Sequence, residues 1–268
     1  MRPLADLPTA EAERLRGLLF DLDDTFLDHG RLDEHAYASL FRMREAGLAL
    51  VAVTGRPSGW AEVLVRQWPI AAAVTENGAV SIYREGDVLR RLDRADEGER
   101  QERRRRIAGV VAELQRAFPT LHPADDVSAR VSDFTFDIGE HERVPRKTVD
   151  EADSLARALG ARTLRSSVHL HVTLDGDDKA SGSLRLLRLL FDADATEARF
   201  RYAYIGDSEN DAACFAAFAT TLGVQNLSGR PTVPPRYITP SPRSQGFLEA
   251  ARALLERRGV DRGSTSAM

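Results

Sequence analysis

Short apolar runs alternate with helix-like stretches in the first third of the chain. Residues 18–20 and 48–53 are continuous apolar runs, which is typical of strands covered on both faces. Between them, Tyr37, Leu40 and Phe41 recur at the spacing of one helix face, and a third strand is expected near residues 70–74. The alternation of strand and helix predicts an α/β fold with a parallel sheet.

Near Val80 the pattern changes to short strands in which apolar and polar residues alternate. His169, His171 and Thr173, for example, alternate with apolar neighbours, which predicts a strand with one packed and one free face. The α/β rhythm returns at Lys179, so the middle block is expected to be an inserted α+β domain. The predicted units are a core at 17–81 and 179–257, an inserted α+β cap at 82–178, and terminal extensions at 1–16 and 258–268.

Composition and charge exclude several classes of protein. A formal net charge of -4 gives no general attraction to nucleic acid or to anionic membranes. The single cysteine, Cys214, excludes an intrachain disulfide. Residues 1–16 lack the apolar run of a signal peptide, and no stretch is long and apolar enough to cross a bilayer. We therefore expect a cytoplasmic protein without a nucleic-acid or membrane partner, while the oligomeric state has no signal in the sequence.

Polar motifs stand where the predicted core strands end or where helices begin. In open parallel sheets of the Rossmann-like kind, ligands bind beyond the carboxyl ends of the strands, so these motifs are expected to meet in one crevice. The motifs are Asp21-Leu22-Asp23-Asp24-Thr25, Thr54-Gly55-Arg56, Lys179, and Gly206-Asp207-Ser208-Glu209-Asn210-Asp211.

The residue types in these motifs suit the hydrolysis of a phosphomonoester. One of the carboxylates Asp21 and Asp23 can attack phosphorus while the other protonates the leaving oxygen. Carboxylates in one pocket repel one another, and a hard cation bound by oxygen ligands, with Asp207 as the third acid, relieves that repulsion. Thr54 and Lys179 can orient and neutralise the phosphoryl oxygens.

These motifs resemble those of the haloacid dehalogenase superfamily of phosphatases. Its hallmarks are Asp-x-Asp-x-Thr, a strand-end Thr or Ser, a Lys and a Gly-Asp-x-x-x-Asp motif, and all occur here in the family's order. The inserted block, the form Gly-Asp-x-x-Asn-Asp and the segment Glu76-Asn77-Gly78-Ala79 are similar to subclass IIB. That subclass includes Cof-type sugar phosphatases, sucrose-phosphate phosphatase and mannosyl-phosphoglycerate phosphatase.

The resemblance implies roles for individual residues. Asp21 corresponds to the nucleophile and a Mg²⁺ ligand, and Asp23 to the general acid/base whose backbone carbonyl binds the metal. This sequence departs from the family pattern at position 24, where it has Asp24 and the family most commonly has Gly. The resemblance also implies phosphate binding by Thr54, Gly55, Lys179 and Asn210. It implies metal binding by Asp207 and Asp211, where Asp211 either coordinates the metal itself or hydrogen-bonds a residue that does.

Four further residues have two interpretations each. Arg56 either binds substrate or pairs with an acid, and Asn77 is a turn residue first and a ligand contact second. His169 and His171 are either solvated, which the alternation slightly favours, or lie on a face that looks down on the active site and binds the leaving group.

The expected function is Mg²⁺-dependent hydrolysis of a small phosphorylated metabolite, a sugar phosphate or a phosphoglycerate derivative, through an aspartyl-phosphate. A phosphomutase of the phosphomannomutase type is the alternative within the same superfamily. A receiver-like signalling module, which also carries a phosphorylatable Asp, is the alternative from another class. The built-in acid/base Asp23 and the inserted domain argue against a receiver.

Overall fold

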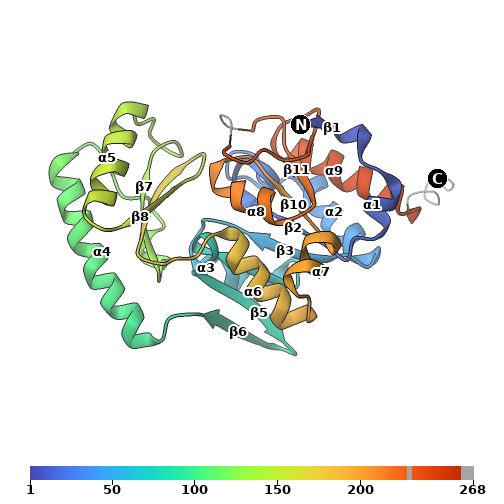
Figure 1. The fold of residues 1–268 in the computed structure, drawn as a ribbon, viewed down its shortest axis with the longest axis horizontal. Helices are drawn as coiled ribbons and strands as arrows, with labels where there is room; N and C mark the ends of the chain where they lie inside the picture. Colours follow the sequence, from blue (N-terminus) through green and yellow to red (C-terminus); the bar gives the residue numbers. More distant parts are fainter. Residues whose placement is uncertain (228–230, 261–268) are drawn as a thin grey trace.

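A computed structural model describes residues 1–227 and 231–260 of the chain (Figure 1). Its larger part is built on one mixed sheet of nine strands. In spatial order these are β1 (Arg2–Pro3), β12 (Tyr237–Ile238), β11 (Thr220–Gly223), β10 (Tyr202–Gly206), β2 (Gly17–Phe20), β3 (Ala49–Val53), β4 (Ala72–Thr75), β5 (Val80–Glu85) and β6 (Val88–Asp93).

The seven strands from β1 to β4 are all parallel, and β5 and β6 extend the sheet antiparallel at one edge. At the centre, Phe20 of β2 lies between Ile205 of β10 and Ala52 of β3 in register. The carboxyl ends of these strands therefore coincide, and the motifs that follow them start from the same edge. The predicted α/β fold with a parallel-sheet core is confirmed.

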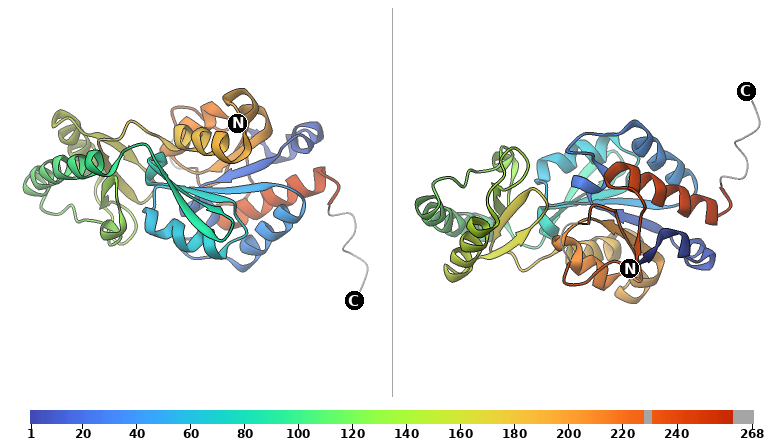
Figure 2. Two further views of the ribbon diagram at one scale, coloured as in Figure 1. Left: turned by 90° about the horizontal axis from the view of Figure 1, so that it is seen from below. Right: turned by 90° about the horizontal axis from the view of Figure 1, so that it is seen from above.

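Helices cover both faces of this sheet (Figure 2). Leu18 and Phe20 belong to the apolar cluster on one face, whereas Leu19 between them belongs to the cluster on the other. This division explains why the central strands are apolar runs without alternation. The first face is covered by α1 (Thr9–Glu13), α2 (Glu34–Glu45), α3 (Ser58–Gln67) and α9 (Arg243–Arg257), and the second by α6 (Lys179–Phe191), α7 (Ala195–Arg201) and α8 (Ala212–Ala217).

The cap, defined here as residues 94–178, lies at one end of the core (Figures 1 and 2). It consists of a three-stranded antiparallel sheet in the order β7 (Asp133–Asp137), β9 (His169–Thr173), β8 (Arg162–Arg165), with helices α4 (Glu97–Ala117) and α5 (Arg146–Ala158). Phe136, Leu170 and Val172 pack with the helices in a separate apolar cluster.

The alternation predicts that the polar face of the cap sheet is free, but in the structure this face is buried. All five residues of β9 are buried, with 0% of His171 exposed. In this respect the interpretation of His169 and His171 as a solvated pair is wrong, because this face is closed off by the core.

The cap begins later in the chain than the sequence suggested. β5 and β6 run to Asp93 and pair with the core sheet, so the predicted boundary at residue 82 is too early. Nor is the segment 1–16 an appendage, because it supplies β1 and α1 and buries Leu4 and Leu15 in the core. In the extension predicted at 258–268, Arg258 still bonds backbone carbonyls of the core, and residues 261–268 lie outside the described residues.

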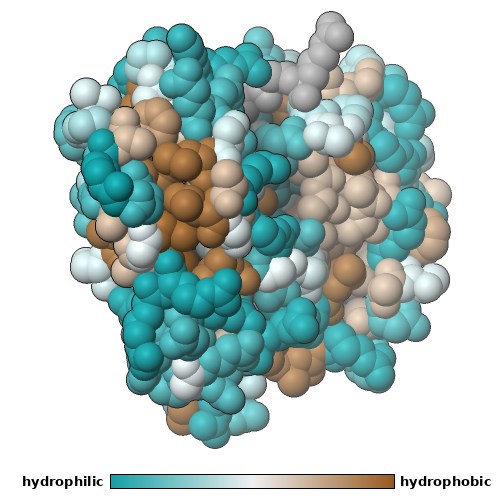
Figure 3. Space-filling model, turned by 60° about the vertical axis from the view of Figure 1, so that its left-hand side comes forward, coloured by the Kyte–Doolittle hydropathy of each residue, from teal (hydrophilic) through white to brown (hydrophobic). Residues whose placement is uncertain are grey.

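The cap end of the molecule is mostly hydrophilic, with separate hydrophobic patches among the polar side chains (Figure 3). Arg104, Arg105 and Arg106 of α4 are exposed, whereas Arg103 is half-buried and pairs with Asp175. Within residues 1–227 and 231–260, no helix combines the length and the hydropathy needed to span a bilayer.

Candidate active site

Lys179 connects the first and last of the sequence motifs. Its Nζ donates hydrogen bonds to Oδ1 of Asp21 and to Oδ1 of Asp211, each at 2.7 Å. Lys179 is the first residue of α6, and the side chain of Asp178 caps that helix by accepting from the backbone N–H of Ser181. The hydroxyl of Tyr204 also donates to Asp211. Asp21 and Asp211, which are 158 and 32 positions away from Lys179 in the sequence, are thus brought together at the strand ends.

Three carboxylates gather around this lysine. Oxygens of Asp21, Asp207 and Asp211 lie within 4.8 Å of one another, and all three residues are buried. Asp211 is oriented by the backbone N–H groups of Asp207 and Ser208, which donate to its Oδ2 at 2.9 and 3.0 Å. Gly206 allows this approach, since a Cβ there would lie 2.4 Å from the same oxygen.

The charges of this cluster are not balanced by the chain itself. Burial raises the pKa of Asp21 to about 7, although Lys179 opposes the shift, and burial with Asp21 and Asp211 nearby raises the pKa of Asp207 well above its usual value. Three carboxylates beside one ammonium leave two negative charges, which one divalent cation neutralises. The all-oxygen donor set suits Mg²⁺. Asp21, Asp207 and Asp211 are therefore the residues that would hold it.

Asp23 points to a different partner, Arg56. Nε of Arg56 donates to Oδ2 of Asp23 at 2.9 Å and Nη2 donates to Oδ1 at 2.8 Å, so both carboxylate oxygens are bound. The same guanidinium donates to both oxygens of Glu140 in the cap, at 2.6 and 3.1 Å, and lies over the ring of Trp60. Of the two interpretations of Arg56, pairing with an acid is confirmed. The side chain of Asp23 is not among the clustered carboxylates, and metal binding through its carbonyl stays a prediction.

The loop after β2 turns these acids into the crevice. Leu22–Phe26 forms a single irregular helical turn in which Asp24 has a φ of 53°. Gly adopts such a backbone without strain, and Asp is among the side chains that tolerate it best. The Asp24 carboxylate accepts from Nε of Arg243 at 3.0 Å and is not one of the three clustered acids. This accounts for the carboxylate that the sequence could not place.

The predicted phosphate-binding residues lie at the same edge of the sheet. Thr54 is fully buried at the end of β3, and its Oγ1 accepts from the backbone N–H of Arg56. Asn210 donates from Nδ2 to Oδ1 of Asn77 at 3.0 Å, and the Ser208 hydroxyl donates to Oδ1 of Asn210 at 2.7 Å. These contacts join the segment Glu76-Asn77-Gly78-Ala79 to the fourth motif. Phosphate contact by Thr54, Gly55 or Asn210 stays a prediction.

Two cap histidines reach the crevice. Nδ1 of His171 lies 2.9 Å from Oδ2 of Asp133, and Arg130, which pairs with Asp133, donates to the carbonyl oxygen of Gly55 at 2.8 Å. Nε2 of His169 lies 2.9 Å from Oε2 of Glu140. The face that carries both histidines therefore looks toward the catalytic loop, as the second of the two interpretations proposed.

Several cap-to-core contacts were missed from the sequence. Glu76 accepts from the backbone N–H groups of Val131 and Ser132, at 3.1 and 2.6 Å, and burial raises its pKa. Asp133 carried a usable signal, because its alternation with Phe134 repeats the pattern of β9 and pairs the two polar faces. Glu140 carried none, since it lies in a loop without periodicity.

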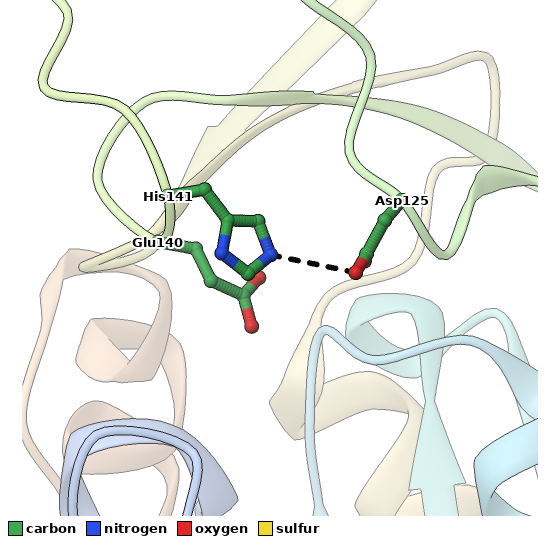
Figure 4. A group of neighbouring side chains, drawn as sticks. All are labelled: Asp125, Glu140 and His141. Carbon is green, nitrogen blue, oxygen red and sulfur yellow. Dashed lines mark ion pairs between the residues drawn. The ribbon is translucent and has the colours of Figure 1, made fainter.

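A second group of possible metal ligands lies on the cap rim (Figure 4). Nε2 of His141 is 3.4 Å from Oδ2 of Asp125, and both residues are exposed. Glu140, the third member, already binds Arg56 with both oxygens. We assign no metal to this group.

Comparisons with known proteins agree with the geometry. Residues 18–96 match the model of the haloacid dehalogenase-like hydrolase family, a range that includes Asp21, Thr54 and Asn77. No curated protein sequence matched the chain significantly.

Solved structures with this fold cover nearly the whole chain. Protein 0175 of Thermoplasma acidophilum has 17% identity and a TM-score of 0.70, over 90% of this chain and 98% of that one. The sucrose-phosphatase of Synechocystis, solved with sucrose and phosphate, has 16% identity and a TM-score of 0.59, over 90% and 98%. The subclass IIB sugar phosphatase BT4131 has 16% identity and a TM-score of 0.60, over 91% and 99%.

The family match covers residues 18–96, and the similar solved structures share the fold over about 90% of the chain. Over residues 18–96 the chain is thus similar to the haloacid dehalogenase-like hydrolases, and as a whole it has the fold of the subclass IIB sugar phosphatase BT4131.

Proposed function

We propose that the chain is a Mg²⁺-dependent phosphatase that cleaves a small phosphorylated metabolite through an aspartyl-phosphate on Asp21. The observation that carries this proposal is the position of Lys179 between Asp21 and Asp211, with Asp207 beside them. A buried nucleophile, a buried cation and a divalent-metal donor set at one point are what phosphoryl transfer requires.

In the first step a carboxylate oxygen of Asp21 attacks phosphorus and the bond from phosphorus to the leaving oxygen breaks. Asp23 gives its proton to that leaving oxygen, so the metabolite departs as a neutral hydroxyl. Lys179 stays bound to Asp21 and offsets the charge on the phosphoryl oxygens. Mg²⁺, when bound by the three acids, supplies electrostatic stabilisation of the same charge.

In the second step water attacks the phosphorus of the acyl phosphate. Asp23, now a carboxylate, takes the proton of that water, and the bond from phosphorus to Asp21 breaks to release inorganic phosphate. Asp23 can serve in both steps only when its oxygens are released from Arg56. Because the other end of Arg56 holds Glu140 of the cap, we propose that cap opening and the release of Asp23 occur together.

The small size of the space beside Asp23 supports that view. The space lined by Asp23, Arg56, Glu140 and Val168 has a volume of about 80 Å³. Pockets for small metabolites generally have volumes of about 300–1,000 Å³. We therefore propose that the cap opens to admit a sugar phosphate or phosphoglycerate beside Asp23. A sugar phosphate is the first choice, because the similar structures include a sucrose-phosphatase and a sugar phosphatase.

A phosphate-release screen over phosphorylated sugars and glycerates, with Mg²⁺, tests the proposal. We expect stoichiometric inorganic phosphate and the free alcohol. An isomeric sugar phosphate without free phosphate would instead indicate a phosphomutase. A long-lived phosphoenzyme without turnover would indicate a receiver-like module.

A further inference from the structure

Two buried nitrogen atoms converge on Gly55 from two different domains. Nε2 of His171, from the cap, and Nδ2 of Asn77, from the core, lie 2.9 and 3.3 Å from the position that a Cβ would take at Gly55. Among the described residues neither nitrogen has a hydrogen-bond partner. The exposed fractions of the two residues are 0% and 2%.

An unpartnered polar atom in such a place needs a reason. A buried donor or acceptor without a partner costs about 1–3 kcal/mol, so native structures rarely keep one. Here two occur side by side, next to the predicted phosphate loop. Thr135, which faces His171 across the cap sheet, adds a buried hydroxyl that also has no partner among the described residues.

The neighbours of His171 decide what its free nitrogen can do. Nδ1 faces the Asp133 carboxylate, which can only accept, so Nδ1 carries the hydrogen and Nε2 presents a lone pair. Burial lowers the pKa of His171 to about 4 despite the opposing effect of Asp133, which keeps the ring neutral near pH 7. His171 therefore offers an acceptor to the crevice.

The neighbours of Asn77 decide its free atom in the same way. The Ser208 hydroxyl donates to Oδ1 of Asn210, and Nδ2 of Asn210 then donates to Oδ1 of Asn77. The remaining Nδ2 group of Asn77 can only donate. The site next to Gly55 thus combines one donor and one acceptor.

We propose that His171 and Asn77 together bind a hydroxyl group of the substrate. Efficient turnover then requires a substrate with a hydroxyl group next to its phosphoryl group. A hydroxyl accepts from Asn77 and donates to His171 at once. A phosphoryl oxygen carries no hydrogen in the dianion and would meet the lone pair of His171 unfavourably. The proposal rests on the proposed phosphatase activity and narrows its substrate to hydroxylated phosphomonoesters such as polyol and sugar phosphates.

The two cap histidines then have different roles. His169 lies against Glu140, which Arg56 binds, and so belongs to the ion-pair network that holds the cap. His171 alone presents a free acceptor to the phosphate loop. Of the two, only His171 is expected to distinguish a hydroxylated ester from its deoxy analogue.

Matched substrate pairs test this directly. The values of kcat/KM are compared for glycerol phosphate against propyl phosphate and for 2-hydroxyethyl phosphate against ethyl phosphate, because each pair differs at the carbon next to the phosphoryl ester. We expect the hydroxylated member to be preferred roughly tenfold to a hundredfold in at least one pair. Equal rates in all pairs would overturn the proposal, while phosphate release from both members would leave the phosphatase assignment intact.

Two variants assign the preference to these residues. His171→Phe keeps a ring and removes the acceptor, and Asn77→Gly removes the donor while tolerating the φ of 53° at that position. Each should bring the ratio of kcat/KM between the hydroxylated and the deoxy member close to one, whatever its effect on the deoxy member alone. Equal losses on both members would contradict the proposal. The matched control is His122→Phe, an exposed cap histidine beside Glu142, which should keep the preference.

A measurement on the unmodified enzyme tests the acceptor itself. Long-range ¹⁵N–¹H spectra distinguish an imidazole protonated at Nδ1 from one protonated at Nε2. At pH 7 we expect the His171 ring to be neutral with its proton on Nδ1. A proton on Nε2 would make His171 a second donor and would refute the assignment.

Discussion

The guanidinium of Arg56 binds both carboxylate oxygens of Asp23 and, on its other side, both oxygens of Glu140. One side chain thus joins the predicted general acid/base to the cap. Arg56 is 2% exposed, so the ion pairs are shielded from solvent and from salt. Breaking one end of such a buried network is costly, because it leaves a charge without its partner. The closed position of the cap and the engagement of both Asp23 oxygens by Arg56 are therefore linked.

Glu140→Gln is expected to loosen the cap. The substitution keeps the shape of the side chain but removes the charge that pairs with Arg56, so the closed population falls. The amides of Val131 and Ser132, which bond Glu76 across the domain boundary, should exchange hydrogen several times faster in mass-spectrometric exchange. Glu142→Gln, at an exposed pair, is the control. Unchanged exchange of these two amides in the Glu140 variant would contradict the linkage.

Acid should weaken the cap–core interface in two stages. Burial lowers the pKa of His171 from 6.5 to about 4, so its contribution is fully present above pH 6.5 and is lost as the pH falls toward 4. Despite their burial, Asp133 and Glu140 have their pKa values lowered to about 2, by Arg130 and His171 for the first and by His169 and Arg56 for the second. Their contributions are present above their ordinary values of 3.8 and 4.5 and are lost toward pH 2.

Thermal unfolding followed from pH 7 to 3 checks this order. Between pH 6.5 and 4 the wild type should lose more stability than His171→Phe, because buried carboxyl groups with raised pKa values act alike in both proteins. Identical pH dependence of the two proteins in this range would show that the histidine is not buried in its neutral form.

Removal of the divalent cation should stop turnover without unfolding the chain. Three carboxylates face one ammonium, so EDTA should abolish phosphate release and Mg²⁺ should restore it. Ca²⁺ should restore it poorly, because its larger coordination shell misplaces Asp21. Calorimetric titration with Mg²⁺ should show that Asp207→Asn binds more weakly than wild type by roughly tenfold or more. Full activity after exhaustive chelation would refute the metal assignment.

Gly78→Ala should destabilise the core and disturb Lys179. Gly78 has a φ of +106°, and a Cβ there would lie 1.9 Å from the carbonyl oxygen of Asp178. The loss should exceed about 1 kcal/mol and appear as a lower Tm. The control is Gly109→Ala in α4, where a Cβ meets nothing within 4 Å and should be neutral or slightly stabilising. Equal Tm values for the two variants would contradict the close packing at Gly78.

The core of the site was predictable because its signals are local. Asp21, Thr54 and Asp207 each follow an apolar run, and parallel strands bring such positions to one edge. Lys179 was identified by its place at the start of a helix. The pattern also indicated an inserted α+β block and its alternating strand at residues 169–173, although it did not indicate β8 and α7, which are short.

What was not predictable depends on contacts between domains. Alternation along β9 shows that one face of the strand is polar. A polar face that is exposed to solvent and a polar face that packs on the core have the same sequence pattern. His171 was therefore ambiguous until Gly55 was seen against its ring. The partners of Arg56 were hidden for the same reason, since Glu140 lies 84 positions away in an irregular loop. The boundary at residue 82 was missed because β5 and β6 are antiparallel strands that continue a parallel sheet.

The central claim is that Asp21 is the nucleophile, and rapid acid quench with ³²P-labelled substrate tests it most directly. Wild-type enzyme should retain covalent label on the peptide that contains Asp21 and release inorganic phosphate on turnover. Asp21→Asn should fold with a similar circular dichroism spectrum, carry no label and lose turnover by several orders of magnitude. Ordinary phosphate release by the purified Asp21→Asn variant, or label on another residue in the wild type, would contradict the account.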